Sequence, residues 1–197
     1  MSFVLGLTGG TGSGKTTIAN YLKTLGAEII DADQVAREVV LPNTVGLRRL
    51  SQNFGTDILK VDGSLDRKKL GKMVFSDENK LTLLNQIMQP LILQNILEHL
   101  VQAKAAKLVV LDAPLLLEQH YQKYCDAVMV VQTSPQVQLK RIMARDHLTL
   151  NDAQKRIASQ MAPDKRVELA DVVIDSSKTV EETRKQVLKW LKISKIL

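Results

Sequence analysis

A glycine-rich segment near the N-terminus has the residue types needed to hold a phosphate chain. It reads Gly9-Gly10-Thr11-Gly12-Ser13-Gly14-Lys15-Thr16 and has the spacing G-x-x-x-x-G-K-[ST] of a P-loop. Glycines let backbone N–H groups approach an anion without a Cβ clash, and the following helix N-terminus adds partial positive charge. Lys15 can neutralise the β- and γ-phosphates, and the Thr16 hydroxyl can bind Mg²⁺. The alternative is a glycine-rich turn whose lysine is merely solvated. The segment predicts nucleotide contacts from Gly10, Thr11, Gly12, Ser13, Gly14, Lys15, Thr16 and Thr17.

Two aspartates after a second apolar run are candidates for the acceptor side of a phosphoryl transfer. Asp31-Ala32-Asp33 closes this run, and residues i and i+2 of a strand face the same way. We expect the run to lie next to the P-loop strand, so that Asp33 can orient an attacking hydroxyl and accept its proton. Alternatively, both aspartates are solvated or cap a helix. Arg37 can bind an acceptor phosphate or pair with Asp33.

Asp112 ends a third apolar run and is the candidate for an indirect contact to a metal ion. A carboxylate at this place can reach Mg²⁺ through water near Thr16, or it can cap a helix before Pro114. A GTPase switch is disfavoured, because Pro114 has no N–H to offer a γ-phosphate. A motor ATPase is disfavoured because it normally needs a larger chain and contacts from a neighbouring subunit.

A basic stretch in the C-terminal half is a candidate cover for the phosphates. Arg141 and Arg145 are four residues apart in a predicted helix, and basic residues continue to Arg166. Guanidinium groups bind phosphates and stack on adenine, so the stretch at 140–166, which we interpret as loop-rich, can close over a nucleotide. The alternative is an exposed surface of mixed charge, because aspartates are interspersed.

Composition narrows the class of protein. The chain has 197 residues, a formal net charge of +6 and 45% hydrophobic residues, enough for a sizeable core. The basic balance favours anionic partners, whereas only 4% aromatic residues argue against stacking of single-stranded nucleic acid. The single cysteine, Cys125, excludes an internal disulfide and is interpreted as an inert packed thiol. No apolar run reaches the length of a membrane span. Composition by itself does not choose among nucleic acid, acidic membranes and phosphorylated small molecules as anionic partners. We expect a cytoplasmic protein whose partner is neither nucleic acid nor a membrane.

Five short apolar runs predict the sheet that must position these residues. They lie at 4–7, 28–31, 108–111, 127–131 and 172–174, and resemble strands that are buried on both faces of a parallel sheet. Helical periods between them predict an α/β fold with helices on both faces. About 75 residues separate the second and third runs, more than one crossover needs. We interpret them as a helical insertion, whose last helix is interrupted at Pro90.

The chain resembles the dephospho-coenzyme A kinase family over essentially its whole length. Beyond the P-loop, the similarity rests on segments that are specific in combination. These are Asp31-Ala32-Asp33, Leu65-Asp66-Arg67, Pro114-Leu115-Leu116-Leu117-Glu118, Gln138-Leu139-Lys140-Arg141, Gln160 and Ala170-Asp171.

The resemblance implies transfer of the ATP γ-phosphoryl group to the 3′-hydroxyl of dephospho-CoA, the last step of coenzyme A synthesis, with Mg²⁺ as cofactor. It implies a P-loop NTPase core of five parallel strands flanked by helices, at residues 1–35, 106–141 and 169–197. A helical acceptor-binding insertion at about 36–105 and a lid at about 142–168 complete the expected single domain. We expect a monomer or a weak homo-oligomer.

The resemblance also implies roles for individual residues. Asp33 and Lys15 would be catalytic, Arg141 would contact adenine, and Ser176 and Ser177 would edge the adenine pocket. The acceptor-binding residues would be Thr8, Asp33, Arg37, Arg67, Gln89, Pro114 and Leu115; the metal would be held by Thr16 and, through water, Asp112.

The sequence departs from the family pattern at two points. Gln89 stands before Pro90 where the family usually has histidine, so a role that needs an imidazole is in doubt. Ser176-Ser177 stands where the family often has asparagine, which removes a side-chain amide contact to adenine. Two rival functions remain open. One is another small-molecule P-loop kinase, such as a nucleoside monophosphate kinase; the other is a nucleotide-dependent binding or switch protein.

Overall fold

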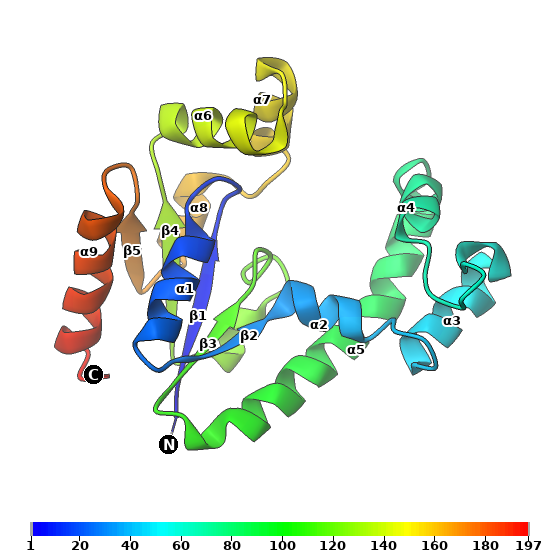
Figure 1. Cartoon of the computed structure of the whole chain (residues 1–197), viewed down its shortest axis with the longest axis horizontal. Helices are drawn as coiled ribbons and strands as arrows, with labels where there is room; N and C mark the ends of the chain where they lie inside the picture. The colour runs from blue at the N-terminus through cyan, green and yellow to red at the C-terminus, as the bar shows by residue number, and fades with distance from the viewer. Residues whose placement is uncertain (1, 197) are drawn as a thin grey trace. The chain divides into compact units, whose positions relative to one another are not determined.

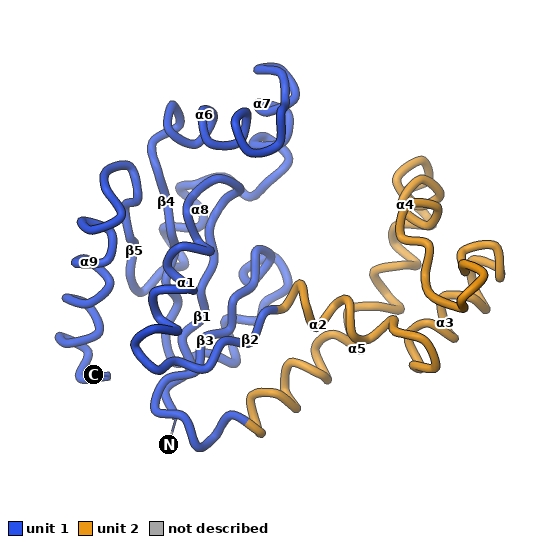
Figure 2. The backbone as a smooth tube through the Cα atoms, in the orientation of Figure 1, with its two compact units in different colours: residues 1–31, 103–197 blue, residues 32–102 orange. Residues whose placement is uncertain are grey.

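The computed structural model describes residues 2–196 and divides the chain into two compact units (Figure 2). Unit 1 contains the residues up to Asp31 and those from Ala103 onward, and unit 2 is Ala32–Gln102. The division falls where strand β2 ends and helix α2 begins. Asp33, which the expected boundaries placed in the core, therefore belongs to unit 2.

Unit 1 is built on a five-stranded parallel sheet, so the predicted fold class is confirmed. The strand order is β2-β3-β1-β4-β5. The bounds are β1 (Phe3–Gly9), β2 (Glu28–Asp31), β3 (Leu108–Asp112), β4 (Ala127–Gln132) and β5 (Val172–Asp175). The register pairs Leu7 with Asp112 on one side and with Met129 on the other. Parallel pairing on both sides of β1 brings the carboxyl ends of β1, β3 and β4 to one edge of the sheet.

The strand order corrects the expectation that β2 lies beside the P-loop strand β1. β3 lies between them, and β2 pairs with β3 alone. Every residue of β3 is buried, whereas Glu28 and Asp31 at the ends of β2 are exposed. A strand with charged, exposed ends suits the edge of a sheet, and one that is buried throughout and begins with four apolar residues suits its interior.

A second correction concerns the backbone at Asp33. β2 ends at Asp31, and α2 (Ala32–Glu38) begins at the next residue. Asp31 and Asp33 are therefore not an i, i+2 pair on one strand face. Asp33 lies in the first turn of a helix, where a carboxylate is favoured by the helix dipole.

A cluster of buried apolar side chains lies on one face of the unit 1 sheet. α1 (Lys15–Thr24) and α9 (Val180–Ile193) contact each other there (Figure 1). Leu5 and Leu7 of β1 share a buried cluster with helix residues such as Leu22 and Leu191. On the other face, Gly6 leaves room for Leu116 and Cys125, because a Cβ at Gly6 would lie 2.9 Å from atoms of both.

The basic stretch at 140–166 is mainly helical, which corrects the loop-rich interpretation. It contains most of α6 (Pro135–Asp146), all of α7 (Leu150–Ala158) and the start of α8 (Pro163–Glu168). The Ser134 and Thr149 hydroxyls cap α6 and α7, and a proline opens α6 and α8.

Unit 2 is helical, as the insertion was expected to be. It consists of α2, α3 (Val45–Phe54), α4 (Arg67–Phe75) and α5 (Glu78–Gln102), with the short helix η1 (Thr56–Ile58). The expected interruption at Pro90 is not found: α5 runs through it. Contacts with α2, α3 and α4 support α5 along its length, and tertiary packing of this kind overrides the local cost of a proline. Within residues 2–196, no helix combines the length and apolar character that crossing a bilayer requires.

Cys125 gives a chemical test of packing in unit 1. Burial raises the pKa of its thiol from an ordinary value near 9 to about 12, and neighbouring Asp126 acts in the same direction. Because the thiolate is the reactive form, its fraction at pH 8 falls by about 10³. We expect Ellman's reagent to react about a thousand times more slowly with the native protein than in urea. Cys125→Ser supplies the blank, since the chain has no other cysteine. Equal rates in the two states would contradict the packing described.

Candidate active site

The P-loop connects β1 to α1 with a backbone that two glycines make possible. Gly12 and Gly14 have φ values of +74° and +87°, which side-chain-bearing residues rarely adopt. Gly14 is the N-cap of α1 and offers no side-chain cap, whereas hydroxyls cap α6, α7 and α9. No acidic residue lies in the first turn of α1. The α1 N-terminus is thus suited to an anion from outside the helix.

Lys15 is held by an ion pair with Asp112. The Lys15 ammonium donates to Asp112 Oδ1, and the two side chains are only 15% and 10% exposed. Asp112 is the last residue of β3, at the sheet edge where the P-loop begins. The structure therefore brings together two residues that the sequence assigned to phosphate and metal. Thr16 and Thr17 follow on α1 and are exposed.

Arg141 ties the P-loop to the segment after β5. Its guanidinium donates to Ser176 Oγ at 3.0 Å, to the Ser176 carbonyl at 2.8 Å and to the Gly12 carbonyl at 3.4 Å. The buried Ser176 hydroxyl in turn donates to the Ser13 carbonyl. A serine in this position is short enough to bridge Arg141 and the P-loop.

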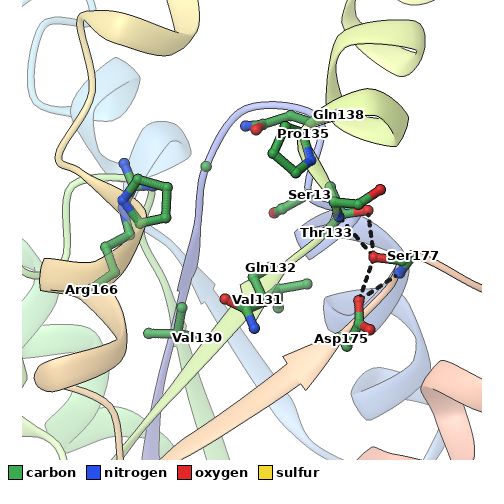
Figure 3. A pocket seen from close by; sticks show the side chains of 13 residues that line it. Ser13, Val130, Val131, Gln132, Thr133, Pro135, Gln138, Arg166, Asp175 and Ser177 are labelled. Atoms are coloured by element: carbon green, nitrogen blue, oxygen red, sulfur yellow. Dashed lines mark hydrogen bonds between the residues drawn. The ribbon is translucent and has the colours of Figure 1, made fainter.

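A cavity of about 350 Å³ lies between the P-loop, the ends of β4 and β5, and α8 (Figure 3). Its polar side chains include Ser13, Gln138, Arg166, Asp175 and Ser177. The Ser177 hydroxyl and amide donate to Asp175, which lowers the pKa of that carboxyl. Ser177 Oγ also accepts from the Ser134 amide at 2.7 Å, so the start of α6 and the end of β5 are joined at the cavity wall.

Arg166 is the buried cation of this cavity. Burial lowers its pKa, while Glu118, 3.9 Å away, acts in the opposite direction. Its Nε has no hydrogen-bond partner within the described residues, nor has Glu118 Oε2. Arg166 comes from the basic stretch singled out in the sequence, but only the fold shows that it is buried while its neighbour Lys165 is exposed.

Two exposed arginines of the same stretch share one carboxylate. Asp146 accepts from Arg145 and from Arg156, each at 2.8 Å, and these contacts lower the pKa of its carboxyl. Arg145 also donates to Thr11 Oγ1 of the P-loop at 3.2 Å. The interspersed aspartate is thus part of a network that touches the P-loop, rather than an unrelated surface charge.

The predicted acceptor residues fall into two groups, one in each unit. In unit 1, Thr8 is fully buried and donates its hydroxyl to the Pro114 carbonyl at 3.2 Å, while Leu115 is 52% exposed. In unit 2, the Arg67 guanidinium donates to the Arg37 carbonyl at 3.3 Å. Both of these arginines and Asp33 are exposed, and Gln89 is half-buried on α5.

Sequence reasoning assigned no site role to several residues that surround the P-loop. They are Glu118, Gln138, Gln160 and Asp175. The first three belong to segments that carry the family resemblance, which was a usable signal. Asp175 ends the last strand, and the strand-end position that singled out Asp112 would also have indicated it.

The fold and site define the class of protein: a P-loop kinase-like fold, with a glycine-rich phosphate loop between the first strand of a parallel sheet and its first helix. A solved shikimate kinase from Acinetobacter baumannii shares this fold, with a TM-score of 0.57 at 17% identity, covering 100% of this chain and 97% of that one.

Closer relatives specify the family. The dephospho-CoA kinase family profile matches residues 3–182. A dephospho-CoA kinase of Enterococcus faecalis is 43% identical over 97% of this chain and 96% of its own length. A dephospho-CoA kinase structure from Campylobacter jejuni has a TM-score of 0.68 at 28% identity, covering 99% of this chain and 97% of that one. The chain belongs to the dephospho-CoA kinase family, as its sequence motifs predicted.

Gly9 gives a test of how closely the P-loop is packed. A Cβ at Gly9 would lie 2.5 Å from the Val131 carbonyl oxygen and 2.6 Å from Ser13 Oγ. Gly9→Ala must therefore shift β1, β4 or the loop itself. We expect it to lower stability by about 1–3 kcal/mol, the usual cost of overpacking, and to weaken ADP binding. Thermal unfolding and calorimetric titration with ADP measure both effects.

Gly71→Ala is the control for this substitution. The nearest atoms to a Cβ at Gly71 belong to the Phe75 ring, at 3.6 Å or more, and Gly71 lies inside α4. Alanine is favoured over glycine in a helix by about 0.5–1 kcal/mol, so this variant should be as stable as the wild type or more so. Unchanged ADP binding by Gly9→Ala would contradict the described packing.

Proposed function

We propose that this protein transfers the γ-phosphoryl group of ATP to the ribose 3′-hydroxyl of dephospho-CoA, giving coenzyme A and ADP. The observation that carries the proposal is similarity to the dephospho-CoA kinase family from residue 3 to residue 182, which spans both units and not the P-loop alone. A nucleoside monophosphate kinase would share the P-loop but not the motifs of unit 2.

The nucleotide side of the reaction belongs to unit 1. The P-loop amides and the α1 N-terminus bind the phosphates, and Lys15 neutralises charge on the transferring group. Lys15 exchanges Asp112 for phosphate oxygens, which its flexible four-carbon stem permits. Arg141 and the Ser176-Ser177 segment edge the adenine, because their mutual hydrogen bonds place a planar guanidinium beside the P-loop.

A divalent metal accompanies ATP in such kinases, and we propose Mg²⁺. The available donors fit: Thr16 would supply a hydroxyl ligand directly, and the Asp112 carboxylate would reach the ion through water. Within residues 2–196, no group of three or more histidine, cysteine or acidic side chains is arranged to hold a metal. This suits an ion held mainly by phosphates and water. When bound, it would neutralise charge on the β- and γ-phosphates.

The acceptor side is proposed to draw on unit 2. Dephospho-CoA carries a pyrophosphate, which guanidinium groups bind; Arg37 and Arg67 are exposed arginines of unit 2, and the Arg67 guanidinium donates to the Arg37 backbone carbonyl. Asp33 orients the 3′-hydroxyl and accepts its proton as the new O–P bond forms and the bond from the γ-phosphorus to the bridging oxygen of ADP breaks. Thr8, being buried, contributes by holding the Pro114-Leu115 loop. Gln89 lies in the position of the family's usual histidine and can donate or accept a hydrogen bond but not exchange a proton.

A ³¹P spectrum of a mixture of ATP, Mg²⁺, dephospho-CoA and enzyme tests the proposal directly. We expect ADP and a new phosphomonoester resonance in equal amounts, because one phosphoryl group moves for each ATP consumed. Lys15→Ala should form the product at least about 10²-fold more slowly, the usual loss for one preorganised donor. ADP with inorganic phosphate alone, or a product only with another hydroxyl acceptor, would refute the assigned reaction.

Asp33→Asn tests the carboxylate. The amide keeps the shape and one hydrogen bond but removes the charge and the proton acceptor. We expect kcat to fall by about 10²–10⁴, the range for a general base, and the ATP dissociation constant to change by less than about threefold. Steady-state kinetics and equilibrium titration measure the two quantities.

Asp31→Asn is the matched control, because Asp31 is also exposed and lies two residues earlier at the end of β2. It should cost far less activity than the change at Asp33. A near-normal kcat in Asp33→Asn would show that Asp33 has no catalytic role and only occupies the first turn of α2. Joint loss of kcat and ATP affinity would instead indicate a residue of the metal's water shell.

A further inference from the structure

Three carbonyl groups of the P-loop are held from outside the loop. Gln138 Nε2 donates to the Thr11 carbonyl at 2.8 Å, and Arg141 donates to the Gly12 carbonyl. Ser176 Oγ donates to the Ser13 carbonyl. In a trans peptide, the C=O and the following N–H point in opposite directions. The N–H groups that follow these carbonyls therefore face away from the donors outside the loop, and the Ser13 N–H donates to the Gly10 carbonyl at 3.0 Å within the loop.

Thr11 is held on both sides. Its carbonyl accepts from Gln138, and its own N–H donates to Gln160 Oε1 at 3.0 Å. Gln138 lies on α6, whereas Gln160 lies just beyond the end of α7. Gln138 and Gln160, which come from two separate elements, thus hydrogen-bond to two consecutive peptide groups of the P-loop.

The residue before Thr11 makes this approach possible. A Cβ at Gly10 would lie 3.0 Å from Gln138 Nε2, 3.3 Å from Gln160 Oε1 and 3.1 Å from Arg166 Nη1. A larger residue would push both amides away from the backbone. Gly10 therefore leaves room for the two glutamines to converge without the shift of a few tenths of an ångström that a Cβ would demand.

We propose that Gln138 and Gln160 form a clamp on Thr11 that fixes the peptide orientations of the P-loop for nucleotide binding. Both are positioning residues, because they act through Thr11 rather than on the substrate. The proposal deepens the kinase function given above and rests on it. Gln160 belongs to the segment expected to form the lid, so the clamp also links the position of that segment to the shape of the P-loop.

The polarity of the clamp is fixed by its backbone partners. A carbonyl can only accept and an N–H can only donate, so Gln138 must act as a donor and Gln160 as an acceptor. Glutamate has the shape of glutamine but, when ionised, only accepts hydrogen bonds. It can therefore replace Gln160 in the clamp, whereas at position 138 it would place a carboxylate against the Thr11 carbonyl.

The experiment compares Gln138→Glu with Gln160→Glu. Each variant adds one negative charge beside Thr11. Gln138 also lines the cavity beside the P-loop, so Gln138→Ala, which adds no charge, is measured alongside to separate the lost hydrogen bond from charge repulsion. We expect the ADP dissociation constant of Gln138→Glu to exceed that of Gln160→Glu at least tenfold, or about 1.4 kcal/mol. This lies within the usual net contribution of one hydrogen bond.

Amide exchange measured by NMR supplies a second readout. The Thr11 N–H should remain protected in Gln160→Glu, which keeps an acceptor, and lose protection in Gln160→Ala. Gln136→Glu, an exposed position on the same helix α6, controls for added charge and should leave Thr11 exchange unchanged. If Gln138→Glu fails to fold, Gln138→Ala replaces it, and it should weaken ADP binding while leaving the melting temperature near that of Gln136→Glu.

Equal ADP affinity in the two glutamate variants, or unchanged Thr11 exchange in Gln160→Ala, would overturn the clamp. Neither readout needs dephospho-CoA. A wild-type protein that failed to phosphorylate dephospho-CoA would therefore refute the proposed function while leaving the test of the clamp intact.

Discussion

The orientation of the peptide groups between β1 and α1 is the constraint on which the candidate site depends. A phosphate chain is bound by backbone N–H groups. In a trans peptide the N–H points opposite to the carbonyl of the preceding residue, so an N–H can face the phosphate only if that carbonyl faces away. The carbonyls of Thr11, Gly12 and Ser13 are held by Gln138, Arg141 and Ser176. Preorganised donors of this kind need no rearrangement when charge develops on the transferring group. Residues from the C-terminal third of the chain therefore hold the backbone of the N-terminal P-loop in position.

Four cations around the P-loop have acidic side chains beside them. Lys15 pairs with Asp112, Arg145 and Arg156 share Asp146, and Arg166 lies near Glu118. Pairing limits the cost of gathering cations in one place, because opposite charges nearby favour the charged forms. The formal charge of +6 is thus less informative than its local distribution.

The proposed acceptor residues are divided between the two units, whereas the P-loop belongs to unit 1. Unit 1 contains the P-loop and the Thr8–Pro114 contact, while Asp33, Arg37 and Arg67 belong to unit 2. Asp33 follows the last residue of β2 by two positions, so the proposed catalytic carboxylate lies at the junction in the chain. Each unit has its own helices and its own buried side chains.

The sequence by itself determined the five strands, the P-loop and the family, because these depend on local runs and on residue types at fixed spacing. It also predicted the helical insertion, since its length exceeded a single crossover. Three predictions from the sequence were wrong: that β2 lies beside β1, that Asp33 lies on a strand, and that α5 is interrupted at Pro90. Strand order and helix continuity are decided by which apolar surfaces pack together, and no local pattern records that choice. The same holds for Gln138, Gln160 and Arg166: their places around Gly10 and Thr11 arise from contacts between residues far apart in the chain, so only the tertiary structure decided them.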